Sequence, residues 1–225
     1  MKTLFEKIRA KQKKFLAQMD LEKFNHVGKT VCLKKGDVIA NPEGEIIVAI
    51  EGGLSLCMDP DMEHTTHKFM TSESLLFFTV MPFTILGYAE SYATHVPLYY
   101  YVEQDISILK MTCQEFEDNF LHKDEKTRID TLSMLSFSTA YMLDIINERT
   151  GMQGYEIIRS LIYRYMAIST ETNINATSLS SFIVKRSKLS RSYVFKILSE
   201  LKLGGYINMV NGKLLSINSH LPARF

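Results

Sequence analysis

Residues 112–150 contain neither glycine nor proline, and this stretch constrains the fold more than any other feature of the sequence. From Ile129 onward its apolar residues lie three to four positions apart, or at multiples of that spacing, which is the period of an α-helix. We therefore expect one long helix over residues 123–150, ended by Gly151 and Gly154. Such a helix separates two parts of the chain that have different sequence patterns.

The middle of this helix, residues 131–143, contains no charged side chain. A helix that packs on a core with one side normally keeps a polar face, so we expect this helix to be covered on more than one side. It is either the central core helix of one molecule or the seam of a homodimer, and we favour the seam. The residues expected at the dimer interface are Ile129, Leu132, Leu135, Ser136, Met142 and Ile145.

Short apolar runs separated by turn residues fill residues 26–122, a pattern typical of an all-β sandwich or barrel. Ahead of them, residues 1–25 are expected to form a basic amphipathic helix, because apolar residues at roughly helical spacing alternate with five lysines and arginines between Leu4 and Met19. The runs expected to form strands are 30–33, 36–39, 46–50, 54–58, 69–70, 75–81, 99–102 and 106–111.

Charge is distributed unevenly along the chain, although the net charge is only +1. Residues 1–35 hold 10 Lys and Arg against 3 Asp and Glu, residues 36–177 hold 8 against 21, and residues 178–225 hold 8 against 1. A C-terminal block so poor in acids is typical of a nucleic-acid binder, because phosphates are neutralised by clustered cations. A solvated basic face without a nucleic-acid partner is the alternative.

The C-terminal segment, residues 151–225, has the pattern of a winged helix-turn-helix. Leu179 and Ile183 belong to a first short helical pattern, and Ser190 is suited to cap a second helix. Asn211 and Gly212 then stand between two alternating apolar runs, which is a strong signal for a β-hairpin, the wing.

The second helix of this motif begins with residue types that contact DNA. Arginine suits bidentate contact with guanine, serine reaches bases or phosphates, and lysine favours phosphates. Lys188 occupies the turn position that glycine usually fills, so we expect a left-handed backbone there. The residues expected to contact DNA are Lys185, Arg186, Lys188, Ser190, Arg191, Ser192, Tyr193, Lys196 and Lys213.

The order of these modules resembles the cyclic AMP receptor protein and FNR family of bacterial regulators. The resemblance covers nearly the whole chain and rests on residues 35–39 (KGDVI), 47–53 (IVAIEGG) and 190–198 (SRSYVFKIL), and on the closing wing. It implies an α+β fold with an N-terminal β-roll of the cyclic-nucleotide-binding kind, a double-stranded β-helix. A long central dimerisation helix and a C-terminal winged helix-turn-helix follow. The implied partner is double-stranded DNA, bound by a homodimer at two-fold sites.

The chain departs from this family at the ligand pocket. In nucleotide-binding members a Gly-Glu-Leu cassette and a following Arg hold the cyclic phosphate, whereas no Lys or Arg occurs here between Lys68 and Lys110. A buried phosphate would lack a permanent cation, so we expect no cyclic nucleotide to bind. The degenerate ligand cassette consists of Gly87, Tyr88, Ala89, Glu90 and Ser91.

Two further departures concern the iron-sulfur cluster and the DNA target. The oxygen-sensing branch needs four cysteine ligands, but this chain has only Cys32, Cys57 and Cys113, which are expected to behave as small apolar residues. No cofactor is therefore expected. Ser192 stands where the family usually has Glu, so the target sequence should differ. The chain also resembles a smaller branch with degenerate effector domains, the inhibitor of hydrogen peroxide resistance regulators of enteric bacteria, which implies a role in oxidative stress.

Other classes of function find no support in the sequence. No nucleophile, base and orienting group stand at a recognisable spacing, so we expect neither catalytic residues nor enzymatic activity. His64 and His67 lie in a polar loop, where solvation is a simpler interpretation than metal binding. The longest uncharged run, residues 74–89, is interrupted by Pro82 and is too short to span a membrane, and the N-terminus lacks an export signal. We expect a cytoplasmic protein.

Three hypotheses remain. The first is a sequence-specific transcription regulator whose β-roll is structural, responds to an unknown signal or contacts RNA polymerase. The second is a small-molecule or redox sensor that uses the barrel interior and has DNA binding as its output. The third is a protein-interaction module that uses the winged helix without DNA. The basic N-terminal helix fits each of them, by contacting DNA flanks or by packing on the barrel.

Overall fold

The computed structural model describes residues 3–40, 44–58, 75–92, 98–169 and 177–224. These residues form two compact units, one of residues 4–143 and one that begins at Asp144 and runs to the C-terminus. The division falls inside the long helix α4 (Glu125–Gly151), which therefore contributes to both units. The sequence predicted this helix at about 123–150, but as a segment separate from its neighbours.

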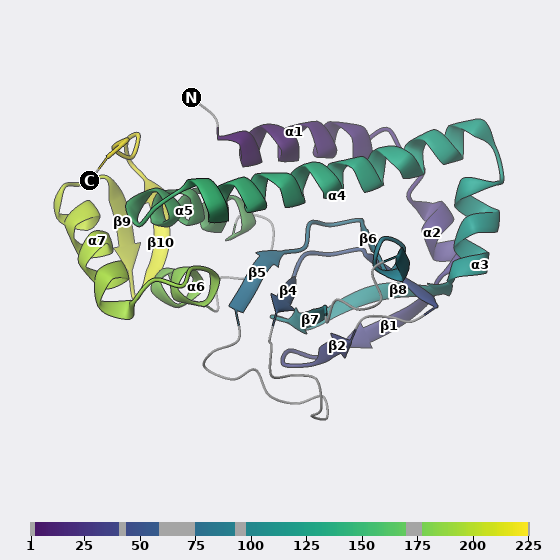
Figure 1. Cartoon of the computed structure of the whole chain (residues 1–225), viewed down its shortest axis with the longest axis horizontal. Coiled ribbons are helices and arrows are strands. Elements are labelled where there is room, and N and C mark those ends of the chain that lie inside the picture. The colour runs from purple at the N-terminus through teal and green to yellow at the C-terminus, as the bar shows by residue number, and fades with distance from the viewer. Residues whose placement is uncertain (1–2, 41–43, 59–74, 93–97, 170–176, 225) are drawn as a thin grey trace. The chain divides into compact units, whose positions relative to one another are not determined.

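The N-terminal unit is built on two four-stranded antiparallel sheets (Figure 1). One sheet has the strand order β1-β8-β3-β6 and the other β2-β7-β4-β5, so strands distant in sequence are neighbours in both. The pairing of β1 with β8 brings Lys29 opposite Lys110 and Leu33 opposite Ile106. The strands are β1 (Lys29–Leu33), β2 (Val38–Ala40), β3 (Glu45–Ala49), β4 (Leu54–Met58), β5 (Leu75–Thr79), β6 (Thr84–Leu86), β7 (Tyr99–Val102) and β8 (Ile106–Thr112).

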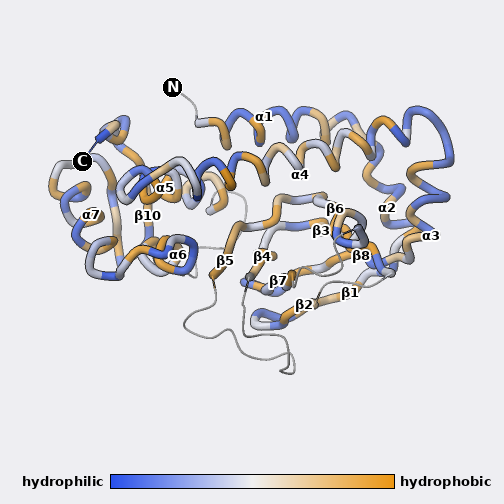
Figure 2. The backbone as a smooth tube through the Cα atoms, viewed as in Figure 1, coloured by the Kyte–Doolittle hydropathy of each residue, from blue (hydrophilic) through white to orange (hydrophobic). Residues whose placement is uncertain are grey.

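Helices complete the core of this unit. Its buried apolar cluster joins Ile46 and Leu109 of the strands to Phe24, Phe116 and Phe120 of the helices. Helix α1 lies against α4 through ring contacts such as that between Phe15 and Phe137, and hydrophobic residues recur along both helices (Figure 2). The helical elements are α1 (Leu4–Leu16), α2 (Glu22–Val27), the short η2 (Glu90–Tyr92), α3 (Cys113–Phe116) and η3 (Glu117–Leu121).

The C-terminal unit has one core shared by three helices and a hairpin. Tyr165 of α5 packs edge to face on Phe182 of α6, and both rings are buried. The elements are α5 (Tyr155–Ser169), α6 (Leu179–Arg186), α7 (Arg191–Leu203), β9 (Ile207–Val210) and β10 (Lys213–Ile217). This order, with β9 and β10 as an antiparallel pair, is that of a winged helix-turn-helix, as the sequence predicted.

A buried ionic cluster fastens the end of α4 to α5 within the C-terminal unit. The Arg164 guanidinium donates through Nε to Glu148 at 2.9 Å and through Nη2 to Asp144 at 2.5 Å. Ser160 also donates to Glu148. All three charged side chains are buried. Because two carboxylates oppose one cation here, the cluster depends on Arg164 more than on either acid.

The α+β fold expected from the sequence is confirmed, with differences in detail. Strand β6 and helix α2 were not anticipated, and the expected strand at 69–70 and the loop of His64 lie outside the described residues. The expectation for Lys188 is wrong. Among the described residues only Phe83 and Asn211 are non-glycine residues with positive φ, so Lys188 does not have a left-handed backbone. Ser187 ends α6 in an extended conformation instead, and no left-handed turn is needed. No helix in the described ranges combines the length and apolarity that crossing a membrane requires.

Candidate nucleic-acid interface

The two helices of the helix-turn-helix are each started by a serine cap. Ser178 accepts a hydrogen bond from the Ser181 N–H at 3.2 Å, and Ser190 accepts one from the Tyr193 N–H at 3.3 Å. Each cap satisfies one of the N–H groups that a helix start leaves without a partner. The cap at Ser190 therefore fixes where α7 begins, and places Arg191 and Ser192 in its first turn.

The buried side of α7 determines which side faces outward. Val194, Ile197, Leu198 and Leu201 are buried in the core of the C-terminal unit. At 3.6 residues per turn, these positions leave the opposite face free for contacts. The exposed residues of α7 are Arg191, Ser192, Phe195, Lys196, Ser199, Lys202 and Leu203.

The wing is tied to the start of the first helix. The Leu179 N–H donates to the Gly212 carbonyl at 2.8 Å. Asn211 and Gly212 have φ of 51° and 77°, the left-handed pair that a two-residue type I′ hairpin requires. Lys213, the first residue of β10, is exposed beside this turn. The hairpin predicted from Asn-Gly is thus confirmed, and its tip is held in a defined place relative to α6.

Most of the expected DNA contacts lie on the surface. The exposed members of the set are Lys185, Lys188, Ser190, Arg191, Ser192, Lys196 and Lys213. None of their polar groups is needed by the core, apart from the Ser190 hydroxyl that caps α7. The five cations among them lie on α6, in the turn, on α7 and at the start of β10, and exposed cations are the groups that neutralise phosphates.

Two expected contacts are not on this surface. Arg186 is only 2% exposed, and its guanidinium lies 4.0 Å from the centroid of the Phe182 ring, so it is a core residue and does not reach a phosphate here. Tyr193 is half-buried and packs on the core with its hydroxyl against Gly154. Helical periodicity identifies both as inward-facing, whereas their residue types had indicated DNA contact. Sequence reasoning also missed Phe195 and Ser199, which are exposed.

Helix α4 carries a regular row of exposed residues. Spacings of three and four alternate along it, the pattern that packs one helix against another in a coiled coil. The hydroxyls in the row donate to carbonyls of their own helix, Ser136 to Leu132 at 2.7 Å and Thr139 to Leu135 at 3.0 Å. Burying these hydroxyls against a second helix would therefore not leave them without a hydrogen bond. The row consists of Ile129, Leu132, Ser136, Thr139, Leu143, Ile146 and Thr150.

This row overlaps only partly with the expected dimer interface. Ile129, Leu132 and Ser136 belong to it, while Met142 is exposed and Leu135 half-buried beside it. Ile145 is 1% exposed and belongs to the interior of the chain, which corrects its assignment to the interface. The sequence analysis missed four members of the row, which the alternating spacing identifies and apolarity alone does not. They are Thr139, Leu143, Ile146 and Thr150.

The degenerate ligand cassette is closed by its own residues. Glu90 is buried and accepts hydrogen bonds from the Gly87 N–H at 2.8 Å and from the Tyr100 hydroxyl. Burial, and then the Glu90 carboxylate, raises the pKa of Tyr100 far above its ordinary value, so the hydroxyl remains a donor. Tyr88 is half-buried, and Ala89 and Ser91 flank Glu90, with the Ser91 hydroxyl donating to the Tyr88 carbonyl at 2.6 Å. A carboxylate thus occupies the backbone donor that an anionic ligand would need.

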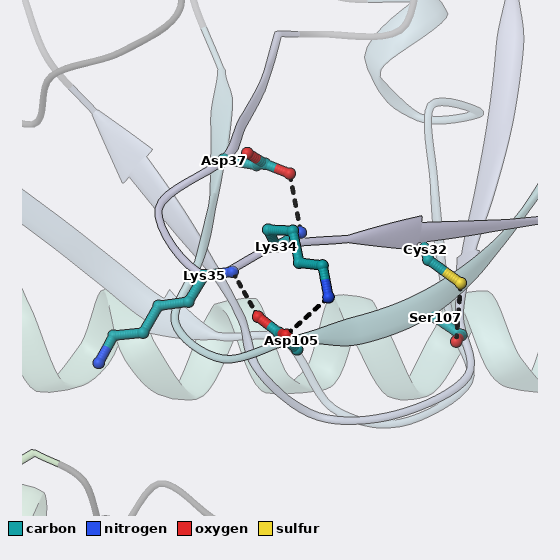
Figure 3. A network of polar contacts seen from close by, with 6 residues as sticks. All are labelled: Cys32, Lys34, Lys35, Asp37, Asp105 and Ser107. Atoms are coloured by element: carbon teal, nitrogen blue, oxygen red, sulfur yellow. Dashed lines mark hydrogen bonds and ion pairs between the residues drawn. The ribbon is translucent and has the colours of Figure 1, made fainter.

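A second polar cluster closes the turn between β1 and β2 (Figure 3). Asp105 accepts from the Lys35 N–H at 2.9 Å and from Lys34 Nζ at 2.9 Å, and these bonds, the backbone one first, lower the pKa of Asp105. Asp37 accepts from the Lys34 N–H at 2.8 Å. Cys32 is exposed, unlike the buried Cys57, and its Sγ lies 3.9 Å from Ser107 Oγ. The cluster is on the surface and stabilises a turn.

Within the described residues, no three His, Cys, Asp or Glu side chains are arranged to hold a metal ion.

Comparison with known proteins agrees with this architecture. Residues 154–223 match the family model described as winged helix-turn-helix DNA binding. Over 75 residues the chain is 35% identical to the Escherichia coli protein named Inhibitor of hydrogen peroxide resistance, and the match covers 33% of this chain and 35% of that protein. The curated relative is therefore matched over only about a third of its length.

Two solved structures share the fold across nearly the whole chain. A mutant of CooA from Carboxydothermus hydrogenoformans has a TM-score of 0.64 at 13% identity, over 91% of this chain and 89% of that one. A protein from Eubacterium rectale, described as a transcriptional regulator of the crp/fnr family, has a TM-score of 0.55 at 11% identity, over 91% and 93%. The fold is that of the cyclic AMP receptor protein and FNR regulators, as the sequence resemblance implied.

Proposed function

We propose that this chain is a sequence-specific, DNA-binding transcription regulator that acts as a homodimer in the cytoplasm. The observation that carries the proposal is the exposed N-terminal part of α7, where Arg191 and Ser192 in the first turn and Lys196 in the second lie outside the core. In helix-turn-helix proteins the N-terminal residues of the second helix enter the major groove and contact base edges. The match of residues 154–223 to a DNA-binding family model supports the same function.

Binding to DNA tests this directly. The full-length protein is used to select sites from randomised duplexes, and fluorescence anisotropy then measures Kd over a salt series. Replacing Arg191 and Lys196 together by Ala is expected to weaken binding to the selected site by about 30-fold or more, because each well-placed contact is worth roughly 1–3 kcal/mol. Lys202→Ala, an exposed lysine at the far end of α7, is the matched control and should have a small effect. Selected binding that survives the double substitution would contradict the proposal.

The dimer is proposed to form through the exposed row of α4. Its alternating spacing and its internally satisfied hydroxyls suit a helix pair that buries Leu143 and Ile146 against a second copy. Leu143→Glu is expected to convert the dimer to a monomer in sedimentation velocity and to abolish binding to a two-fold site. Leu4→Glu changes a leucine of similar exposure, 54% against 61%, on α1 and should leave the dimer intact. A wild-type chain that sediments as a monomer at micromolar concentration would refute this part.

We also propose that regulation does not use a cyclic nucleotide. The expected pocket has no Lys or Arg between Lys68 and Lys110, and Glu90 already takes the Gly87 donor. Millimolar cyclic AMP or cyclic GMP should therefore leave the thermal midpoint and the DNA affinity unchanged, since a ligand that binds only the folded state would raise the midpoint.

A role in oxidative stress is proposed from the relative's name, Inhibitor of hydrogen peroxide resistance. Because that match covers only about a third of the relative, the proposal depends on one shared segment of 75 residues and not on the whole relative. It predicts that cells lacking this protein survive hydrogen peroxide better than cells carrying it. Complementation with the Arg191→Ala, Lys196→Ala variant should fail to restore sensitivity.

A further inference from the structure

The exposed face of α7 carries a phenylalanine among polar side chains. Phe195 is 56% exposed, with Ser192 one turn before it, Ser199 one turn after it and Lys196 beside it. The apolar cluster of the C-terminal unit is formed by other residues of this helix, among them Val194 and Leu198, and does not include Phe195. The core therefore gives no reason for a large apolar residue at this position.

We propose that Phe195 recognises a thymine in the target site by contacting the C5 methyl group of that base in the major groove. The inference rests on the proposed DNA-binding function and adds a specificity-determining residue to it. Phe195 is the fifth residue of α7, next to the cations expected to hold the DNA backbone and bases. This is the part of a recognition helix that contacts base edges.

The chemistry of the groove selects this partner. The major-groove edges of the four bases present hydrogen-bond donors and acceptors, and thymine alone adds an apolar group, its methyl. A phenyl ring placed over a donor or acceptor would remove water from it without replacing the hydrogen bond, which is unfavourable. Placed over the thymine methyl, the ring buries apolar surface on both partners. Phe195 thus favours thymine and disfavours the other bases at one position of each half-site.

The neighbouring residues do not provide this contact. Ser192, Lys196 and Ser199 carry polar ends, and the other large apolar residue exposed on α7 is Leu203, which is 84% exposed. Leu203 lies eight residues after Phe195, about 12 Å along the helix axis at 1.5 Å per residue. Because it is the last residue of α7, it lies away from the end that enters the groove. Leu203 is therefore the matched control for exposure and apolarity.

The test removes the methyl group from the DNA and the ring from the protein. Each thymine of a selected site is replaced by deoxyuridine, which keeps the same hydrogen-bonding groups and lacks only the methyl. Kd is measured by fluorescence anisotropy at fixed salt for the wild-type chain and for Phe195→Ala, Phe195→Leu and Leu203→Ala. Thermal unfolding of each variant confirms the fold, which an exposed position should preserve.

We expect replacement at one thymine per half-site to weaken wild-type binding about fourfold per methyl lost, the effect of burying one methyl-sized group. Phe195→Ala should bind the thymine and uracil sites equally, Phe195→Leu should keep part of the preference, and Leu203→Ala should keep all of it. The inference is overturned if the wild-type chain selects a site but tolerates uracil at every position, or if the uracil penalty persists in Phe195→Ala.

These outcomes separate the inference from the function on which it rests. A chain that binds no duplex in a sequence-dependent way overturns both the regulator proposal and the role of Phe195. Selective binding without a uracil penalty overturns only the role of Phe195, as would be found if the ring stacks between bases at a kink or contacts another protein.

Discussion

The β-roll and the winged helix-turn-helix place their polar side chains in opposite ways. In the β-roll, Glu90 and Tyr100 are buried and bonded to each other, and the buried Ser55 hydroxyl donates to Glu103. In the winged helix-turn-helix, the cations at the start of α7 are exposed and the core behind them is apolar. The first region thus bonds these buried polar groups to one another, whereas the second exposes cations that a partner could neutralise. The difference is consistent with the proposal that the C-terminal unit is the part that binds DNA.

The largest effect on stability is expected at the buried ionic cluster of the C-terminal unit, which is an exception to the apolar core of that unit. Arg164→Ala leaves Asp144 and Glu148 buried without their cation, which should cost about 3–5 kcal/mol in the free energy of unfolding. Urea denaturation followed by circular dichroism measures this loss. Arg159→Ala removes a less buried arginine of α5 that donates to the Pro222 carbonyl, and should cost far less. Similar losses in the free energy of unfolding for both variants would show that the ionic cluster stabilises the fold no more than the Arg159 contact does.

The next largest effect is expected at the contact between Tyr100 and Glu90, which closes the ligand cassette of the β-roll. Tyr100→Phe removes the hydroxyl that donates to Glu90 and leaves a buried carboxylate with one donor fewer, which should cost about 1–3 kcal/mol. Tyr101→Phe is the matched control, because successive residues of a strand face opposite sides of the sheet and Tyr101 is half-buried. Equal losses in urea denaturation would mean that the Glu90 contact is not what stabilises this region. A gain of cyclic nucleotide binding by Tyr100→Phe would further undermine the view that the pocket is closed.

The sequence predicted the C-terminal unit closely, because its signals are local. A capping serine, a buried helical face and an Asn-Gly turn each act within a few residues, and Ser190, Val194 and Asn211 adopt the structures expected of them. The same locality explains the errors. Arg186 was assigned to DNA by its charge, although its position one turn after Phe182 turns it toward the core.

The β-roll was predicted less completely because its pairing is non-local. The short apolar runs indicated strands, but nothing within one run identifies its partner, and β3 lies between β6 and β8. Strand β6 has only three residues and was hidden in a longer uncharged run. The burial of Glu90, a residue of η2, was not foreseen either, because its donor Tyr100 lies ten residues away on strand β7.

A smaller effect concerns Tyr193, which, like Arg186, was expected to contact DNA but packs against the core of the C-terminal unit. A Cβ at Gly154 would lie 2.8 Å from the Tyr193 hydroxyl, and Gly154 has φ of +41°. Gly154→Ala should therefore cost about 1–2 kcal/mol, part from the left-handed backbone and part from the clash. In the Tyr193→Phe background, which removes the hydroxyl, the cost of Gly154→Ala should fall. An unchanged cost in this double-mutant cycle would show that the hydroxyl does not lie there in solution.

The smallest effect is a difference in how two helix caps depend on pH. Helix α4 starts with an acidic cap, Asp124, whereas α7 starts with a neutral cap, Ser190. Asp124 accepts from the Thr127 N–H at 2.8 Å and from the Thr127 hydroxyl at 2.7 Å, and these bonds, the backbone one first, lower the pKa of Asp124. A lowered pKa stabilises the fold above the unfolded-state pKa of about 3.9, and that stability is lost as the pH falls through the folded-state value.

Asp124→Ala should therefore lower the thermal midpoint by about 2–4 °C at pH 7. Asp124→Asn keeps an acceptor without the charge, so its smaller deficit relative to wild type should shrink as the pH is lowered below about 4. Ser190→Ala removes the neutral cap of α7, and its deficit should not follow this titration. If the deficits of Asp124→Asn and Ser190→Ala had the same pH dependence between pH 7 and 3, the charge of Asp124 would not contribute to the stability of α4.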